Sequence, residues 1–123
     1  MKITLLSDHA LRAEDQPGPL TIEAESAEMV YSPFHMVASG LAVCTFSVLQ
    51  SWASHAKLDA AGLTVAIGWT FAEDPHRVGE YEVRIVWPAL PEARRAAAVR
   101  AAELCAVKNT LAHPPAIRAE VAT

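Results

Sequence analysis

The two cysteines of this 123-residue chain, Cys44 and Cys105, are the side chains with the widest range of chemistry. A cysteine thiolate can act as a nucleophile, bind a metal ion or form a disulfide. In a reducing compartment two cysteines seldom form a permanent structural disulfide. Three interpretations follow: inert core thiols, metal ligands, or a reversible redox pair.

The five histidines are dispersed along the chain, at His9, His35, His55, His76 and His113. The sequence contains no CxxC motif and no paired Cys/His spacing of the kind that binds zinc. Each histidine taken alone is typical of a structural or surface position. Metal binding is therefore the weakest of the three interpretations, and the sequence predicts no metal site.

A long apolar helix must position Cys44. The segment from Ser32 to Lys57 carries no charge between its ends and has Cys44 near its middle. Ser32 is a favourable N-cap, because its hydroxyl can accept a hydrogen bond from a free N–H of the first turn, and Pro33 suits the first helical position. At ~1.5 Å per residue, such a helix is roughly 35 Å long. It must be covered on nearly every side.

One broad face of this helix carries Cys44 among small side chains. With ~100° per residue, the face consists of Val37, Gly40, Leu41, Cys44, Ser47, Val48, Ser51 and His55. The small residues allow another backbone to approach, so we expect the sulfur to lie at a helix interface. A membrane span would also fit the length, but polar side chains are scattered through the segment and the alternating strands after it are typical of a soluble domain.

Two strand-forming stretches precede the helix. Residues 2–6 form the first, the polar stretch after them can continue extended to a turn at residues 16–19, and residues 20–26 alternate apolar and polar side chains. This alternation predicts a half-buried strand with Leu20 and Ile22 on its buried face. We expect these residues to form one hairpin.

The segments after the helix complete the predicted fold. Residues 63–72 and 80–87 both alternate and predict an antiparallel hairpin, whose apolar face the central helix is expected to cover. A second helix is predicted from Pro91 to Cys105. A short irregular or one-turn helical segment follows, and then a last strand at residues 116–123. The order of elements predicts an α+β fold with antiparallel sheet.

The composition bounds the size of the domain and the class of partner. Hydrophobic residues make up 52% of the chain and the mean hydropathy is +0.19, which is apolar for a small monomer. The chain is expected to form a single domain over residues 1–123 and to bury its apolar helix in an obligate homodimer. A net charge of −4 argues against general binding to nucleic acid or to an anionic membrane. The first residues of the sequence lack the basic, then apolar, then small-residue order of a signal peptide, so a cytoplasmic location is expected.

Two motifs around the cysteines resemble the family of osmotically inducible protein C and organic hydroperoxide resistance proteins, OsmC/Ohr. The first is SPFHMVASGLAVCT, from Ser32 to Thr45, which is similar to the family's proline, run of small and apolar residues, and cysteine at the same distance. The second is CAVKNTL, from Cys105 to Leu111, which is similar to a Cys-Pro-Val-x-Asn-Thr-Leu motif. With the order of elements, the resemblance covers nearly the whole chain.

The resemblance implies an OsmC-like fold, in which antiparallel sheets wrap around the long central helices of an intertwined homodimer. It also implies a thiol-dependent peroxidase that reduces organic hydroperoxides in oxidative-stress defence. Cys44 would be the peroxidatic thiolate, which becomes a sulfenic acid, and Cys105 would be the resolving thiol that closes a disulfide. An external dithiol would reduce this disulfide, and no bound cofactor is expected.

The sequence departs from the family pattern where the family activates its cysteine. The family's reductases use an arginine from the N-terminal strands, held by a glutamate directly after the helix-starting proline. Here that position is Phe34, and Arg12 is the only N-terminal arginine. His35 falls on the opposite face of the helix from Cys44, and His55 lies ~16 Å away along the axis. Two alternatives therefore stay open: a non-catalytic protein of this fold that binds a small apolar ligand, and a redox sensor.

Overall fold

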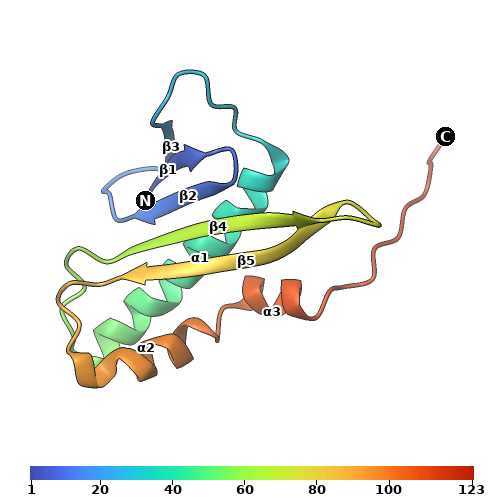
Figure 1. The fold of residues 1–123 in the computed structure, drawn as a ribbon. Helices are drawn as coiled ribbons and strands as arrows, with labels where there is room; N and C mark the ends of the chain where they lie inside the picture. The colour runs from blue at the N-terminus through green and yellow to red at the C-terminus, as the bar shows by residue number, and fades with distance from the viewer.

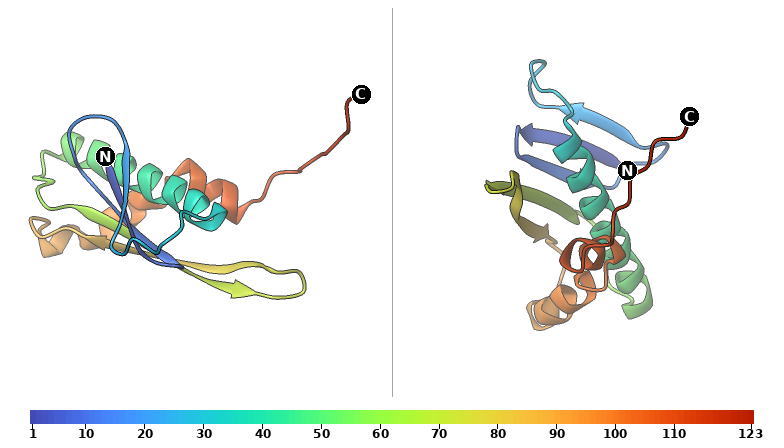
Figure 2. Two further views of the ribbon diagram at one scale, coloured as in Figure 1. Left: turned by 90° about the horizontal axis from the view of Figure 1, so that it is seen from above. Right: turned by 90° about the vertical axis from the view of Figure 1, so that its right-hand side faces the viewer.

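The computed structural model describes residues 1–123 as a five-stranded sheet with one long helix packed across it (Figure 1). The elements are β1 Lys2–Ser7, β2 Ala10–Glu14, β3 Thr21–Ala24, α1 Pro33–Ala56, β4 Thr64–Ala72, β5 Arg77–Val86, the 3₁₀ turn η1 Glu92–Arg94, α2 Arg95–Ala102 and α3 Ala106–Ala112. The strands lie in the order β3-β1-β2-β4-β5. Helix α1 packs on β2 and β4, and α2 and α3 lie beside α1 (Figures 1 and 2). The predicted α+β class is confirmed.

Helix α1 has the limits that the sequence predicts. The Ser32 hydroxyl accepts a hydrogen bond from the His35 backbone N–H at 3.2 Å, and His35 Nδ1 accepts one from the Ser32 backbone N–H at 3.2 Å. This reciprocal arrangement is a capping box, with histidine in place of the usual glutamate or glutamine. Lys57 ends the helix in the left-handed conformation, with φ of 57°.

The surface of α1 is only partly covered. Its sheet-facing side chains, which include Leu41, Phe46 and Leu49, are buried, but Met36 is 53% and Val37 43% exposed. The expectation of cover on nearly every side is therefore not met within one chain. By length and composition α1 could cross a membrane, and 44% of its most apolar stretch is buried; the core helix of a soluble protein meets the same criterion.

The β4–β5 hairpin confirms the clearest strand prediction. Its register pairs Val65 with Ile85 and Trp69 with Tyr81. The side chains of β4 that face α1 are buried, since every second residue points to the same face of the sheet. Phe71 is the exception: it lies beyond a register shift near the hairpin tip and is 42% exposed.

Two edge-to-face aromatic pairs join α1 to this hairpin at opposite ends. Near the start of α1, the ring of Phe34 lies 4.9 Å from the ring of Phe71 at an angle of 82°. Near the end of α1, the ring of Trp52 lies 5.9 Å from that of Trp87 at 87°. Trp87 is held in turn by a hydrogen bond from Nε1 to the Asp59 carbonyl at 2.7 Å. Such pairs add stabilisation beyond the burial of the rings.

The N-terminal strands correct the predicted hairpin. A turn at Asp8 and His9 joins β1 and β2 in antiparallel register, and β3 then pairs in parallel with the other edge of β1. The turn predicted at residues 16–19 instead belongs to the connection that carries the chain from β2 across to that edge. The sheet is therefore mixed. Because β3 lies at the sheet edge, beyond the cover of α1, Leu20 is 56% and Ile22 42% exposed, and the prediction of a half-buried strand is wrong for this chain.

The predicted second helix is divided before Cys105. It consists of the 3₁₀ turn and α2, which ends at Ala102, and a further helix, α3, begins at Ala106. Cys105 has ψ of 122°, an extended conformation that turns the chain between α2 and α3. The irregular or one-turn segment expected after Cys105 is therefore a seven-residue helix.

The last strand predicted at residues 116–123 does not form within the chain. Pro114 and Pro115 follow α3, and the segment after them is extended, makes no sheet pairing and leads away from the body of the molecule (Figures 1 and 2). Ile117 is 90% and Val121 91% exposed. The apolar alternation that predicted a strand is present, but this segment reaches no sheet edge of its own chain.

Candidate functional site

The structure brings the two cysteines together. Cys44 lies in the middle of α1 and is partly exposed, whereas Cys105 lies between α2 and α3 and is 0% exposed. Their side chains are within hydrogen-bonding range of each other, and both thiols are reduced. A pair of thiols so placed can close a disulfide.

Local structure fixes the position of Cys105. Its sulfur is the N-cap of α3 and accepts a hydrogen bond from the Lys108 backbone N–H at 3.4 Å. On the preceding helix, Ala98 and Ala101 are buried, and these small side chains allow α2 to lie close to α1. The alanine-rich sequence of α2 and the cap of α3 thus together bring Cys105 to Cys44.

The surroundings of the two sulfurs differ in their effect on acidity. Burial raises the pKa of Cys44. Hydrogen bonds from the Cys105 thiol and from the backbone N–H groups of Val107 and Ala106 lower it, and together they outweigh burial, so that the pKa lies below its ordinary value. The pKa of Cys105 is raised, first by burial and then by its hydrogen bond to Cys44. Cys44 is therefore the more acidic thiol, with the Cys105 thiol as its donor.

An apolar groove of about 460 Å³ opens beside Cys44. It is lined by Cys44, Ser47, Val48, Ser51, Trp52 and His55 of α1, and by Ala101 and Leu104 of the α2 region. All of these α1 residues except Trp52 belong to the face that the helical wheel placed around Cys44. The groove has the size and character of a site for a small apolar molecule, with a nucleophilic sulfur in its wall.

Comparison with known proteins assigns the family. The family model described as OsmC-like protein matches residues 26–120. The chain belongs to the OsmC-like family. The matched range includes α1, both cysteines and the groove, so the resemblance seen in the two cysteine motifs is confirmed. A search of curated proteins found no match.

Two solved structures share the OsmC-like fold. One is a protein of Psychrobacter arcticus 273-4 whose name refers to osmotic stress induction and a detoxification response; it is 22% identical, with a TM-score of 0.61 over 88% of this chain and 84% of that chain. The other is an OsmC-like hydroperoxide resistance protein from Jannaschia sp. CCS1, 21% identical, with a TM-score of 0.59 over 80% of this chain and 71% of that chain. At this identity the similarity concerns the fold.

Phe34 and Arg12, the two residues compared with the family's activating pair, do not form a network with Cys44 in this OsmC-like chain. Phe34, at the position where the resemblance places a glutamate, packs on Phe71 and His76 of the β4–β5 hairpin. Arg12 alternates with the buried residues of β2, so it lies on the sheet face opposite α1, where it is 3.7 Å from Glu14.

The two histidines of α1 have separate surroundings. His35 is buried, with Nδ1 beside the Ser32 hydroxyl at 2.7 Å and Nε2 beside the Ser7 carbonyl at 2.8 Å, which is a structural role. His55 lines the groove at the end remote from Cys44, with Nδ1 2.9 Å from the Ser51 carbonyl. No group of three or more His, Cys, Asp or Glu side chains is arranged to hold a metal ion.

Sequence reasoning missed two contributors to the site. One is the first turn of α3, whose backbone N–H groups at Ala106 and Val107 act to lower the pKa of Cys44. The other is Thr45, whose side chain acts to lower the pKa of Cys105. The first could have been found by treating Cys105 as a cap residue in front of a helix-forming stretch. For Thr45, the only signal was its place directly after Cys44.

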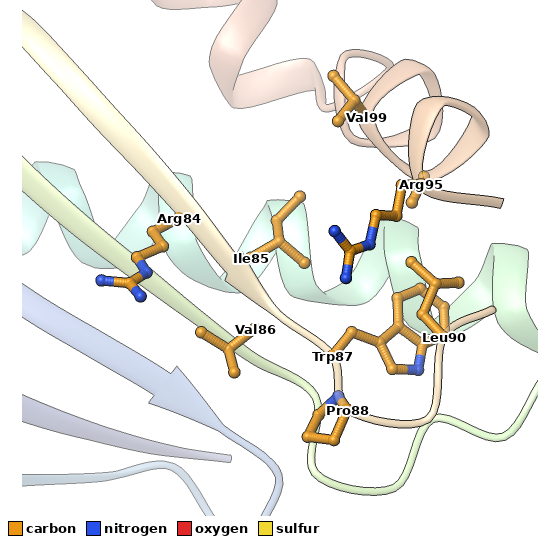
Figure 3. A pocket seen from close by; sticks show the side chains of 9 residues that line it. Arg84, Ile85, Val86, Trp87, Pro88, Leu90, Arg95 and Val99 are labelled. Carbon is orange, nitrogen blue, oxygen red and sulfur yellow. The ribbon is translucent and has the colours of Figure 1, made fainter. Parts of the chain in front are cut away.

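A second cavity, of about 440 Å³, lies between the end of β5 and α2 and contains neither cysteine (Figure 3). Arg84 of β5 and Arg95 of α2 flank it, and Trp87 and Leu90 from the loop after β5 line it (Figure 3). Its lining includes no nucleophile and no carboxylate, so the chemistry of the protein centres on the groove beside Cys44.

Proposed function

We propose that this OsmC-like protein is a thiol peroxidase that reduces organic hydroperoxides through Cys44 and Cys105. The observation that carries the proposal is the pairing of an acidic, groove-lining thiol with a buried, less acidic one. The Cys44 thiolate attacks the peroxide O–O bond, the alcohol leaves after taking up a proton, and Cys44 becomes a sulfenic acid. Cys105 then attacks this sulfur, an S–S bond replaces the S–O bond, and water leaves. An external dithiol reduces the disulfide.

The proposed activation of Cys44 uses donors in place of a cation. The Cys105 thiol and the backbone N–H groups of Ala106 and Val107 favour the anion. They are supplied by the segment that also carries the resolving thiol. The aromatic residue at position 34 then has no part in activation and belongs to the packing of α1.

The groove supports an organic hydroperoxide as the substrate. Its walls beside Cys44 include Val48, Trp52 and Leu104, which offer apolar contacts to the body of an alkyl or aryl hydroperoxide. Hydrogen peroxide could reach the sulfur, but it has no apolar body to contact the groove walls. The protein should therefore prefer an apolar hydroperoxide as its substrate.

A homodimer is part of the proposal. Met36 and Val37 on α1 and Ile117 and Val121 on the C-terminal segment are apolar side chains that one chain leaves exposed. The outer edge of β5 is also unpaired. A second copy would bury these surfaces, and a disulfide cycle that depends on a dithiol suits a reducing, cytoplasmic location.

The proposal is tested by adding one equivalent of cumene hydroperoxide to the reduced protein and following both cysteines by peptide mass spectrometry. We expect a disulfide between Cys44 and Cys105 and one equivalent of cumyl alcohol. Cys44→Ser should abolish alcohol formation, whereas Cys105→Ser should give one turnover and a sulfenic acid that dimedone traps. Unchanged thiols in the wild-type protein would exclude the peroxidase.

The absence of the expected glutamate favours a second candidate function, a binding protein or redox sensor of the same fold. Phe34 holds no charge that could activate a thiol, and the apolar groove is present with or without catalysis. A binding protein would be thermally stabilised by cumyl alcohol and would consume no peroxide. A sensor would form the disulfide but would not sustain peroxide reduction with any dithiol.

A further inference from the structure

Thr45 lies beside the Cys105 segment, in a cavity that it lines with Ala102, Glu103 and Lys108, and it does not line the substrate groove. Thr45 is 2% and Cys105 0% exposed, and a side-chain hydrogen bond from Thr45 acts to lower the pKa of Cys105. Consecutive residues of a helix are turned by ~100°, so Cys44 and Thr45 point in different directions. Cys44 lines the groove, and Thr45 lines a separate cavity of about 190 Å³ together with Lys108.

The sulfur of Cys105 has two hydrogen-bond donors from different elements. The Lys108 backbone N–H bonds to the sulfur at 3.4 Å, and the Thr45 hydroxyl supplies a second donor from α1. A helical threonine commonly donates to the carbonyl four residues earlier, as Thr110 does to Ala106 at 2.8 Å. The Thr45 hydroxyl is instead a donor to the sulfur of Cys105, which lies between α2 and α3.

The effect of these donors on the protonation of Cys105 changes during the reaction. While Cys44 is a thiolate, its charge and its hydrogen bond keep the proton on Cys105. Once Cys44 is oxidised, that charge is gone, and the donors that remain at Cys105 favour the thiolate needed for attack. Thr45 and the Lys108 N–H are those donors.

We propose that the Thr45 hydroxyl stabilises the Cys105 thiolate as it attacks the oxidised Cys44, and so determines the rate of disulfide closure. The inference deepens the proposed function and rests on it for its place in the peroxide cycle. The closure step itself is general: the Cys105 thiolate forms the new S–S bond, the group on the Cys44 sulfur leaves with the electron pair, and the proton of Cys105 passes to that group or to solvent.

The experiment uses DTNB, an aromatic disulfide, because it isolates closure from peroxide chemistry. Cys44 attacks DTNB and releases one thionitrobenzoate, leaving a mixed disulfide. Cys105 then attacks the Cys44 sulfur and releases the second. Thr45→Val should leave the first release unchanged and slow the second roughly tenfold, as expected for loss of one hydrogen bond to a charged group. Thr45→Ser should restore it, and the control Thr110→Val should match the wild-type protein.

Each outcome decides the role of Thr45. An equal second release in Thr45→Val and the wild-type protein overturns the proposal, as does an equal slowing of both releases, which indicates distorted packing. If Thr45→Val does not fold, the pair Thr45→Ser and Thr45→Ala compares presence and absence of the hydroxyl without the methyl group. If cumene hydroperoxide leaves both thiols unchanged, the peroxidase fails separately, and the DTNB rates still decide the role of Thr45.

Discussion

The sulfur of Cys105 accepts a hydrogen bond from the backbone N–H of Lys108 at 3.4 Å, so one cysteine both caps α3 and meets Cys44. Helices leave their first N–H groups without intrahelical partners, and a cap satisfies one of them. A sulfur that turns to bond Cys44 becomes a poorer acceptor for Lys108. The redox state of the pair is therefore coupled to the first turn of α3.

Oxidation should loosen α3. Losing a cap costs about 1 kcal/mol, which corresponds to roughly fivefold faster hydrogen exchange where opening is local. We expect the amides of Ala106–Ala112 to exchange faster in the disulfide form than in the reduced form, by hydrogen-exchange mass spectrometry. Peptides from α2 serve as the internal control. Equal protection of α3 in both forms would contradict the coupling.

The acidity of the two thiols should differ in alkylation. Because the pKa of Cys44 is lowered and that of Cys105 raised, Cys44 should react with iodoacetamide at a midpoint pH below that of a free cysteine and Cys105 at one above it. Cys105→Ala removes a donor to the anion, so the Cys44 midpoint should rise. Peptide mass spectrometry across a pH series gives both midpoints. A Cys44 midpoint at or above that of a free cysteine would refute the assignment.

Filling the groove should discriminate between peroxides. Ser51→Trp places a large ring in the groove and should lower kcat/KM for cumene hydroperoxide roughly tenfold, since about 1.4 kcal/mol of apolar contact is lost. The value for hydrogen peroxide should change little. Gln50→Trp is the matched control, because Gln50 is exposed on the same helix and does not line the groove. Equal losses for both peroxides would show that the groove does not select the substrate.

The exposed C-terminal segment should contribute to dimerisation. We expect the chain to sediment as a dimer, and Ile117→Asp to raise the dissociation constant at least roughly tenfold, because a charge replaces an apolar contact. Arg118→Ala, on the neighbouring position, is the control. Analytical ultracentrifugation over a concentration series measures both. A monomer at every concentration would refute the homodimer, and a dimer indifferent to Ile117→Asp would exclude this segment from the interface.

The capping box at the start of α1 should be measurable as stability. Ser32→Ala removes the hydroxyl that accepts from the His35 N–H and should lower the free energy of unfolding by about 1 kcal/mol in urea. Ser54→Ala, at an exposed position late in α1, should cost much less. If the two variants are equally stable, the cap contributes nothing beyond a surface serine.

The elements predicted well are those whose signal is local and periodic. The cap at Ser32 and the alternation of β4 and β5 are properties of short stretches. The structure has the cap at Ser32 and β4 at Thr64–Ala72, close to the expected range, whereas β5 begins at Arg77 instead of residue 80. The pairing of β3 could not be read in this way, because its alternation fits either edge and either direction. Residues 116–123 alternate like a strand, yet whether they pair depends on an edge that their own sequence does not encode.

The candidate site was predictable in its two sulfurs but not in their surroundings. The motifs around Cys44 and Cys105 singled out both residues, while their proximity depends on the turn at Cys105 between two helices. The contacts of Thr45 and of the Ala106 N–H arise from that turn and have no periodic signal. The position of Arg12 could not be predicted for the same reason, because the sheet places it on the face away from the helix.

The two aromatic pairs that join α1 to the β4–β5 hairpin have a consequence for chemistry at a distance. Phe34 and Trp52 lie on either side of Cys44 along the helix, and each is in contact with a ring of the hairpin. A rod held near both ends can neither slide lengthwise nor roll about its axis without separating one pair of rings. The direction in which Cys44 points is thus maintained by ring contacts near both ends of α1, and the hairpin tip that carries Phe71 helps to fix the orientation of the nucleophile.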